Sequence, residues 1–80
     1  MITGAQVRAA KALIGWSGSD LASSAKVSLS SIRRIEAVDG VPDSMSVKTL
    51  MSVQYALEMA GIEFLGTPDD GPGVRLKPKK

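Results

Sequence analysis

The chain has 80 residues, a net charge of +2, and neither cysteine nor histidine. This length fits one domain, near the lower limit of what folds alone. The absence of thiols and imidazoles excludes a disulfide framework and the usual metal sites, and it removes the commonest general base and nucleophile of enzymes. No apolar run approaches the roughly 20 residues of a membrane span, and no secretory signal is evident. We therefore expect a cytoplasmic, non-enzymatic protein with no cofactor, no metal, no membrane contact and no evident small-molecule substrate.

The small net charge conceals an uneven distribution. Residues 1–36 carry five basic and two acidic side chains, residues 37–70 carry one basic and six acidic ones, and residues 71–80 carry four basic ones. Such a separation of basic and acidic segments along the chain can orient a protein on a polyanion even when the total charge is small. From charge alone, an ordinary solvated surface of mixed charge is an equal alternative.

The first predicted helix begins after Thr3, which with Gln6 forms a capping-box pattern. Gly15 is a natural helix stop, and Trp16 is expected to close the helix end over the core rather than to serve as a base-stacking platform. The apolar stripe of this helix comprises Val7, Ala10, Leu13 and Ile14.

Two short helices follow, joined by a tight turn. Ser17 and Asp20 form a second capping signature, and the helix they start extends to about Ala25. The turn is expected at Lys26-Val27, with Val27 buried and Ser28 as the cap of a third helix over residues 29–37. In that helix Ile32 and Ile35 share one buried face, so Arg33 and Arg34 between them must point elsewhere.

The last third of the chain predicts one long helix and a hairpin. Ser46 caps the helix and Gly61 ends it. Strands are expected near 62–65 and 74–77, joined by a long loop rich in Gly and Pro, with residues 78–80 frayed. The apolar face of the long helix comprises Val47, Leu50, Met51, Val53, Ala56, Leu57 and Ala60.

These features together resemble the phage-repressor/Cro (Xre) family of helix-turn-helix DNA-binding proteins. The string VRAAKALIGWSGSDLASSAKVSLSSIRRIEA carries the resemblance, which covers roughly residues 4–60. Ala22 matches the small residue where two helices cross, Ile32 the apolar anchor, and Glu36 the acid that ends the recognition helix. More narrowly, the chain is similar to small bacterial Xre-type regulators with a C-terminal hairpin ending in a segment like GPGVRL, here Gly71–Leu76.

The resemblance implies a mainly α, lambda-repressor-like fold. Residues 1–61 would form a four-helix helix-turn-helix domain, and residues 62–80 a β-hairpin and basic tail belonging to the same domain. Lys11 stands where the family usually has an Arg paired with the acid at Glu36, so we expect a structural ion pair between these two residues rather than a catalytic dyad.

Three positions depart from the family pattern. The family often has a phosphate-gripping Gln where this chain has Gly18, a left-handed Gly where it has Lys26, and a polar reader where it has Leu29. Lys26 implies either backbone strain or a shifted turn. Losing the Gln and the polar reader should weaken binding or change what is read, without threatening the fold.

The function that the resemblance implies is sequence-specific binding of double-stranded DNA by a transcriptional regulator, a repressor rather than an activator. The helix near 28–37 would enter the major groove, where an Arg can bond bidentately to guanine. The expected DNA contacts are Ser17, Gly18, Lys26, Ser28, Leu29, Ser30, Arg33, Arg34 and Lys48.

Some of these residues, and the basic tail, also have a simpler structural interpretation. When the resemblance is set aside, an ordinary solvated pair is the preferred interpretation of Arg33 and Arg34. Leu29 is as readily a partly buried anchor as a reader, and the basic tail is more often solubilising than a DNA arm.

One small recognition helix supplies little specificity, so a homodimer on two half-sites is expected. The hairpin edge with Phe64, Leu65 and Met59 is the candidate contact. The competing hypothesis is an antitoxin-like or adaptor protein-interaction module that keeps the fold and binds DNA weakly.

Overall fold

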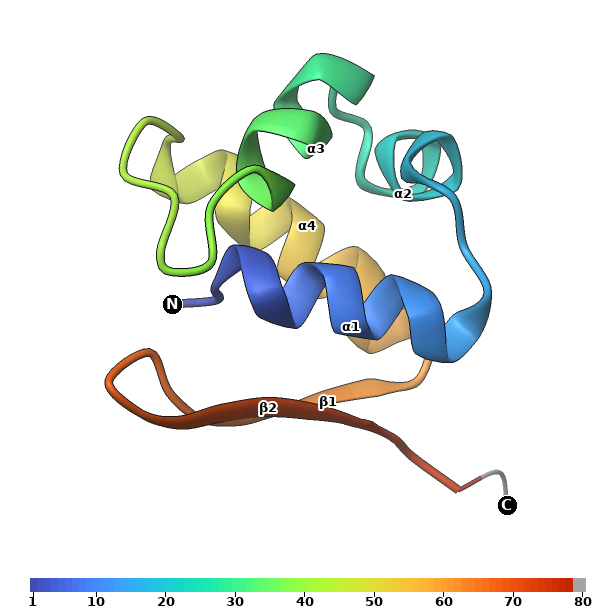
Figure 1. The fold of residues 1–80 in the computed structure, drawn as a ribbon. Helices are drawn as coiled ribbons and strands as arrows, with labels where there is room; N and C mark the ends of the chain where they lie inside the picture. The colour runs from blue at the N-terminus through green and yellow to red at the C-terminus, as the bar shows by residue number, and fades with distance from the viewer. Residues whose placement is uncertain (79–80) are drawn as a thin grey trace.

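The computed structural model describes residues 1–78 and contains four helices followed by a two-stranded antiparallel hairpin (Figure 1). The coarse prediction of a small, mainly helical domain with a C-terminal hairpin is confirmed. None of the helices within residues 1–78 has the length and apolar character needed to cross a bilayer. The elements are α1 (Gly4–Ile14), α2 (Gly18–Ala25), α3 (Leu29–Glu36), α4 (Val47–Met59), β1 (Ile62–Thr67) and β2 (Asp70–Leu76).

Each helix begins at a side chain that the sequence marks as a cap. A cap hydroxyl accepts a hydrogen bond from the amide three residues on, which satisfies one of the free donors of the first turn. In α1 the box is complete, because the Thr3 amide also donates to the Gln6 side chain over 2.9 Å. The four caps are Thr3, Ser17, Ser28 and Ser46, as predicted.

The core is aliphatic and draws on all four helices and β1. Trp16 and Phe64 are half-buried at its edge. Burying one such aliphatic side chain contributes about 1.5–3 kcal/mol. The fully buried large apolar side chains are Val7, Leu21, Ile32, Ile35, Val53, Leu57 and Ile62.

The N-terminus of α1 lies directly against the C-terminus of α3. The Gly4 amide donates to the carbonyl of Gly40 over 2.9 Å. A Cβ on Gly4 would lie 1.9 Å from the carbonyl oxygen of Val38 and 2.4 Å from that of Ile35. Only glycine permits the two backbones to approach this closely.

The hairpin differs from the prediction. The strands extend to Thr67 and from Asp70, so the expected long loop is wrong, and a two-residue turn at Pro68-Asp69 replaces it. The glycines that suggest a loop instead shape the strands. Gly66 lies at a bulge with φ 71°, where a Cβ would be 2.2 Å from the Gly71 carbonyl oxygen.

Gln6 fastens the hairpin to α1. Its side-chain amide nitrogen donates to the carbonyl of Leu65 in β1 over 3.3 Å and to that of Gly73 in β2 over 2.9 Å. Leu65 and Gly73 are direct partners in the ladder. The cap of α1 and the two strands therefore share one buried side chain, and the hairpin packs beneath α1 and the end of α4 (Figure 1).

Several apolar residues expected in the core are at the surface. Leu13 in α1 and Val47 and Met51 in α4 are exposed, and Val27 in the turn is only half-buried. The buried faces of α1 and α4 are thus narrower than predicted, and they comprise Gly4, Gln6, Val7 and Ala10 in α1 and Leu50, Val53, Ala56 and Leu57 in α4. The frayed end expected at Lys79 and Lys80 lies outside the described residues.

Replacing Gly4 by Ala tests the close approach of α1 and α3. We expect Gly4→Ala to lower the free energy of unfolding by about 2–4 kcal/mol, because backbone carbonyls cannot move aside as a side chain can. The midpoint of urea unfolding, followed by circular dichroism, measures the change.

Gly40→Ala is the matched control. No atom lies within 4 Å of a Cβ built on Gly40, whose φ is not positive. Its free energy of unfolding should stay within about 0.5 kcal/mol of the parent. Equal stability of the two variants would show that the Gly4 contact is unimportant.

Candidate nucleic-acid interface

The turn between α2 and α3 lies where the sequence predicts it, without a shift. Lys26 adopts a left-handed conformation with φ 58° and ψ 43°, and within residues 1–78 it alone does so among non-glycine residues. Its amide and that of Val27 bond back to the carbonyl of Ala22, which closes the end of α2. The left-handed region disfavours a side chain by about 1–2 kcal/mol, so the tight turn holds Lys26 under strain.

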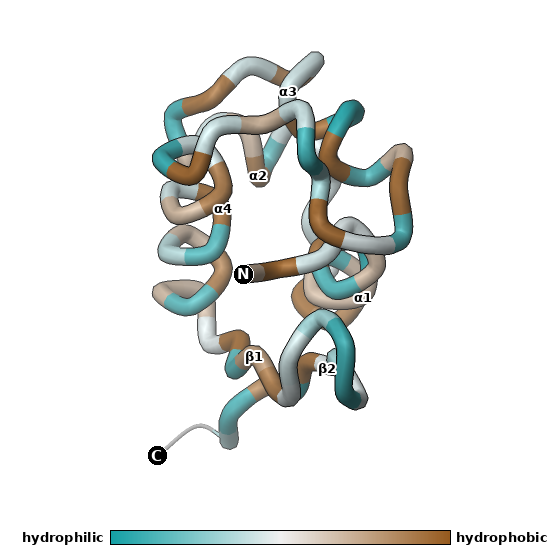
Figure 2. The backbone as a smooth tube through the Cα atoms, turned by 90° about the vertical axis from the view of Figure 1, so that its left-hand side faces the viewer, coloured by the Kyte–Doolittle hydropathy of each residue, from teal (hydrophilic) through white to brown (hydrophobic). Residues whose placement is uncertain are grey.

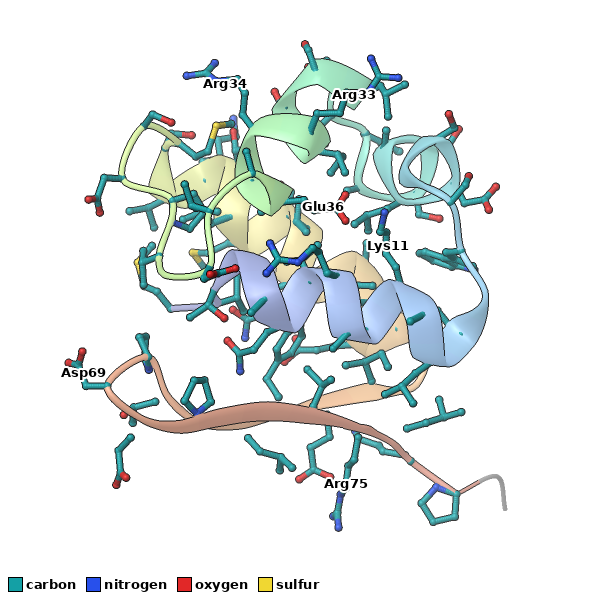
Figure 3. The ribbon with its side chains drawn as sticks, viewed as in Figure 1. Lys11, Arg33, Arg34, Glu36, Asp69 and Arg75 are labelled. Carbon is teal, nitrogen blue, oxygen red and sulfur yellow. The ribbon has the colours of Figure 1, made fainter. Side chains whose placement is uncertain are left out.

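Helix α3 has one buried and one exposed face. Ile32 and Ile35 are completely buried and anchor it. Ser30, Arg33 and Arg34 lie on the opposite, exposed face. In Figure 3 both arginines extend from the top of the molecule, away from α1 and the hairpin. Within the described residues neither arginine forms an ion pair, so their charges remain available to an anion.

Gly18 and Leu29 fit together. Leu29 is half-buried and packs against the core, and its Cδ1 would be 3.2 Å from a Cβ on Gly18. Gly18 thus leaves the space that Leu29 fills. Of the two interpretations of Leu29, this packing favours the anchor over the reader of bases.

The hydroxyl of Ser28 is engaged at the start of α3. It accepts the amide hydrogen of Ser31 over 3.1 Å, donates to the Ser31 hydroxyl over 2.8 Å, and lies 3.1 Å from the hydroxyl of Ser30. A bond to DNA would have to displace one of these. Ser30 keeps more hydrogen-bonding capacity and is the better placed of the two serines.

The start of α2 offers backbone donors. The Ser17 amide donates to the Asp20 carboxylate over 2.9 Å, and the Asp20 amide donates back to the Ser17 hydroxyl over 3.1 Å. The amides of Gly18 and Ser19 are left as donors toward a phosphate. The Asp20 carboxylate lies at the same helix end and opposes an anion there, which makes Ser17 the weakest of the expected contacts.

An ion pair sets the position of α3 against α1. Lys11 Nζ lies 2.8 Å from the Glu36 carboxylate, and the two side chains are only 17% and 16% exposed. The predicted interhelical pair is therefore present, as Figure 3 also shows. Its shielding from water makes it stronger than an exposed pair, and removing one partner would leave a nearly buried charge.

Arg8 is a part of this site that the sequence analysis missed. Its guanidinium donates to the carbonyls of Glu36 and Val38 and pairs with the carboxylate of Asp39, so it caps the C-terminus of α3. A cation is favoured at a helix C-terminus. The available signal was its spacing, since Arg8 and Lys11 are three residues apart and share one face of α1.

Two of the expected DNA contacts, Lys26 and Lys48, are not on α3 itself. Lys26 is exposed at the turn that precedes α3. Lys48 is in the first turn of α4, where it lines a shallow depression on the outer face of that helix with Val47 and Met51. The structure thus gathers Ser30, Arg33 and Arg34 on one surface and assigns Lys48 to another.

Within residues 1–78 no three acidic side chains come together in a way that could hold a metal ion. In comparisons with known proteins, no family model, no curated protein and no solved structure matches this chain.

Relieving the strain at Lys26 gives a direct test of the turn. We expect Lys26→Gly to raise the free energy of unfolding by about 0.5–1 kcal/mol, because glycine adopts the left-handed conformation without a Cβ clash. Lys26→Ala is the matched control, since it removes the same charge but keeps the Cβ. Urea unfolding of the two variants should separate them, and a glycine variant no more stable than the alanine variant would contradict the assigned strain.

Proposed function

We propose that this protein binds double-stranded DNA sequence-specifically and regulates transcription, with α2 and α3 acting as a helix-turn-helix unit. The observation that carries the proposal is the exposed face of α3, where two adjacent arginines without ion-pair partners in the described chain project from a helix anchored by Ile32 and Ile35. Such a helix can enter the major groove, and its arginines can bond to the O6 and N7 atoms of guanine. Ser30 adds a hydroxyl on the same face.

Phosphate contacts would fix the orientation of the protein. The free amides at the start of α2 and the side chain of Lys26 flank α3 on its N-terminal side. Contacts of this kind position a protein on the duplex and make its affinity salt-dependent. Action on DNA accords with a cytoplasmic location in a bacterium and with repression by occupancy of an operator.

Selection from a random pool of duplexes at low salt tests the proposal first. A folded protein that enriches no sequence would contradict it. On an enriched duplex, Arg33→Gln and Arg34→Gln should each weaken binding about 5- to 150-fold if the arginine reads guanine, which corresponds to about 1–3 kcal/mol. An arginine that contacts only phosphate should instead lower the slope of affinity against salt.

Arg75→Gln is the matched control. Arg75 is exposed on β2, pairs with Glu63, and lies at the opposite end of the molecule from Arg33 and Arg34 (Figure 3). The Arg75→Gln substitution removes the same charge as Arg33→Gln and Arg34→Gln, so a purely electrostatic effect would weaken DNA binding equally in all three variants. Unchanged binding by Arg75→Gln, together with weakened binding by Arg33→Gln or Arg34→Gln, would support contact through α3.

Gly18→Gln tests the α2 end of the site. The nearest atom to a Cβ at this position is Cδ1 of Leu29, 3.2 Å away, so a side chain requires a small shift of that flexible group but not of the backbone. An added amide that reaches a phosphate should raise affinity about 2- to 10-fold, as one net hydrogen bond allows. Gly18→Ala supplies the Cβ without the amide and should not gain affinity. A fluorescence titration of both variants decides the matter.

The alternative is a protein-interaction module on the same fold. Under that hypothesis Arg33→Ala with Arg34→Ala would leave function intact, whereas a change at Met59 would abolish it. Phe64 is less informative, because it packs against the core and its replacement would also disturb the fold.

A further inference from the structure

Helix α4 carries a second apolar stripe that faces away from the core. Its members recur every four residues, so they form one row about 18 Å long on the helix surface. They are 58–70% exposed, although residues of their size and type are normally buried. The row consists of Val47, Met51, Tyr55 and Met59.

The row is part of a larger continuous surface. Three shallow depressions overlap along it, the first and second sharing Tyr55, the first and third sharing Trp16 and Ala60. The third depression adds the exposed side chains of Leu13 and Leu76. We call this whole surface the α4 face. It comprises the row on α4 together with Leu13, Trp16, Ala60 and Leu76.

The area of the α4 face is close to what a specific interface uses. A large apolar side chain presents on the order of 150–200 Å² when free, so the six exposed ones offer on the order of 500–700 Å². A monomer rarely exposes a contiguous apolar patch above about 600 Å², and a specific interface buries about 800 Å² per partner. The face is therefore large for a free surface and small for an obligate dimer.

The charge pattern suits a second copy of the same chain. Across a two-fold axis a surface meets itself, so like charges would oppose each other on a charged face. Lys48 alone is charged among the residues that line the three depressions, and it lies near one end. Glu58, which is exposed and three residues after Tyr55 on α4, lies toward the other end of the same row. A face with one basic and one acidic side chain at opposite ends has little net charge to attract an acidic or basic peptide, and it can meet its own copy in antiparallel orientation without repulsion.

The position of the α4 face also suits a dimer on DNA. In Figure 2, α4 runs along one side of the molecule, with α3 at the top and the hairpin at the bottom. A two-fold axis that passes beside α4 toward the α3 end leaves both α3 helices exposed on the same side. An interface through the hairpin would bury the end of the molecule opposite Arg33 and Arg34 (Figure 3).

From these observations we infer that the α4 face is the homodimer interface of this protein. The inference rests on the proposed function in one respect, which is the need for two half-sites. It places the dimer contact on α4, whereas the sequence predicts it at the edge of the hairpin. Met59 belongs both to the α4 face and to the contact predicted from the sequence, but Phe64 packs against the core and Leu65 lies on the hairpin.

Sedimentation velocity without DNA tests the interface. The parent protein should show a concentration-dependent shift from monomer to dimer. Met51→Glu should abolish that shift, because it would bury a carboxylate in an apolar interface. Leu65→Glu, an equal change on the hairpin, should leave it intact. Circular dichroism checks that both variants are folded, which their exposed positions allow.

Cross-linking provides a second test that does not destabilise the dimer. The chain contains no cysteine, so a single introduced thiol is unique. Oxidised Tyr55→Cys should form a covalent dimer faster than Leu65→Cys. Trp16, the one tryptophan, lines the face, so its emission should shift with protein concentration in the parent and not in Met51→Glu.

Three results would overturn the inference: a monomeric parent at every attainable concentration, a dimer that survives Met51→Glu, or a dimer lost in Leu65→Glu. Each of these results can be distinguished from a failure of the proposed DNA binding. A dimer that enriches no DNA sequence would support the α4 interface and contradict DNA binding. A monomer that enriches a single half-site would support DNA binding and contradict the α4 interface.

Discussion

The structure depends on the contact between the N-terminal half of α1 and the C-terminal end of α3. Gly4 lets the two backbones meet, Arg8 caps the last carbonyls of α3, and the Lys11–Glu36 pair fixes their relative rotation. A helix of eight residues is too short to be stable by itself. Helix α3 is held at one end by its Ser28 cap and at the other by α1, with two buried isoleucines between. This support allows the opposite face to carry exposed arginines that contribute nothing to the core.

Within the α2–α3 segment, Gly18, Lys26 and Leu29 each have a structural explanation. Gly18 has no side chain where Leu29 needs space. Lys26 keeps the left-handed turn at the expense of strain. The tight turn and the packing together hold α3 so that Arg33 and Arg34 are exposed on its outer face.

Local chemistry made much of the fold predictable. Caps at Thr3, Ser17, Ser28 and Ser46 are signalled within four residues, and each occurs where expected. The strand limits were missed because Gly66 and Gly71 suggest a loop, although their positive φ values let them face each other at a bulge within the two strands. Periodicity failed at Met51 because α4 has two apolar faces, and spacing alone does not say which one packs inward. The roles of Arg8 and Gly4 depend on contacts about 30 residues away in the chain, which no local pattern contains.

The side chain of Gln6 has a consequence for the pairing of the two strands. β2 contains two glycines and a proline, and a strand of such composition specifies its register weakly. The Gln6 amide donates to Leu65 in β1 and to Gly73 in β2, which face each other in the ladder. A slip of either strand by one residue would remove one of these carbonyls from its donor and leave a buried polar group unsatisfied. Helix α1 therefore acts as an external template for the alignment of the hairpin, and the alignment should be lost when Gln6 is lost.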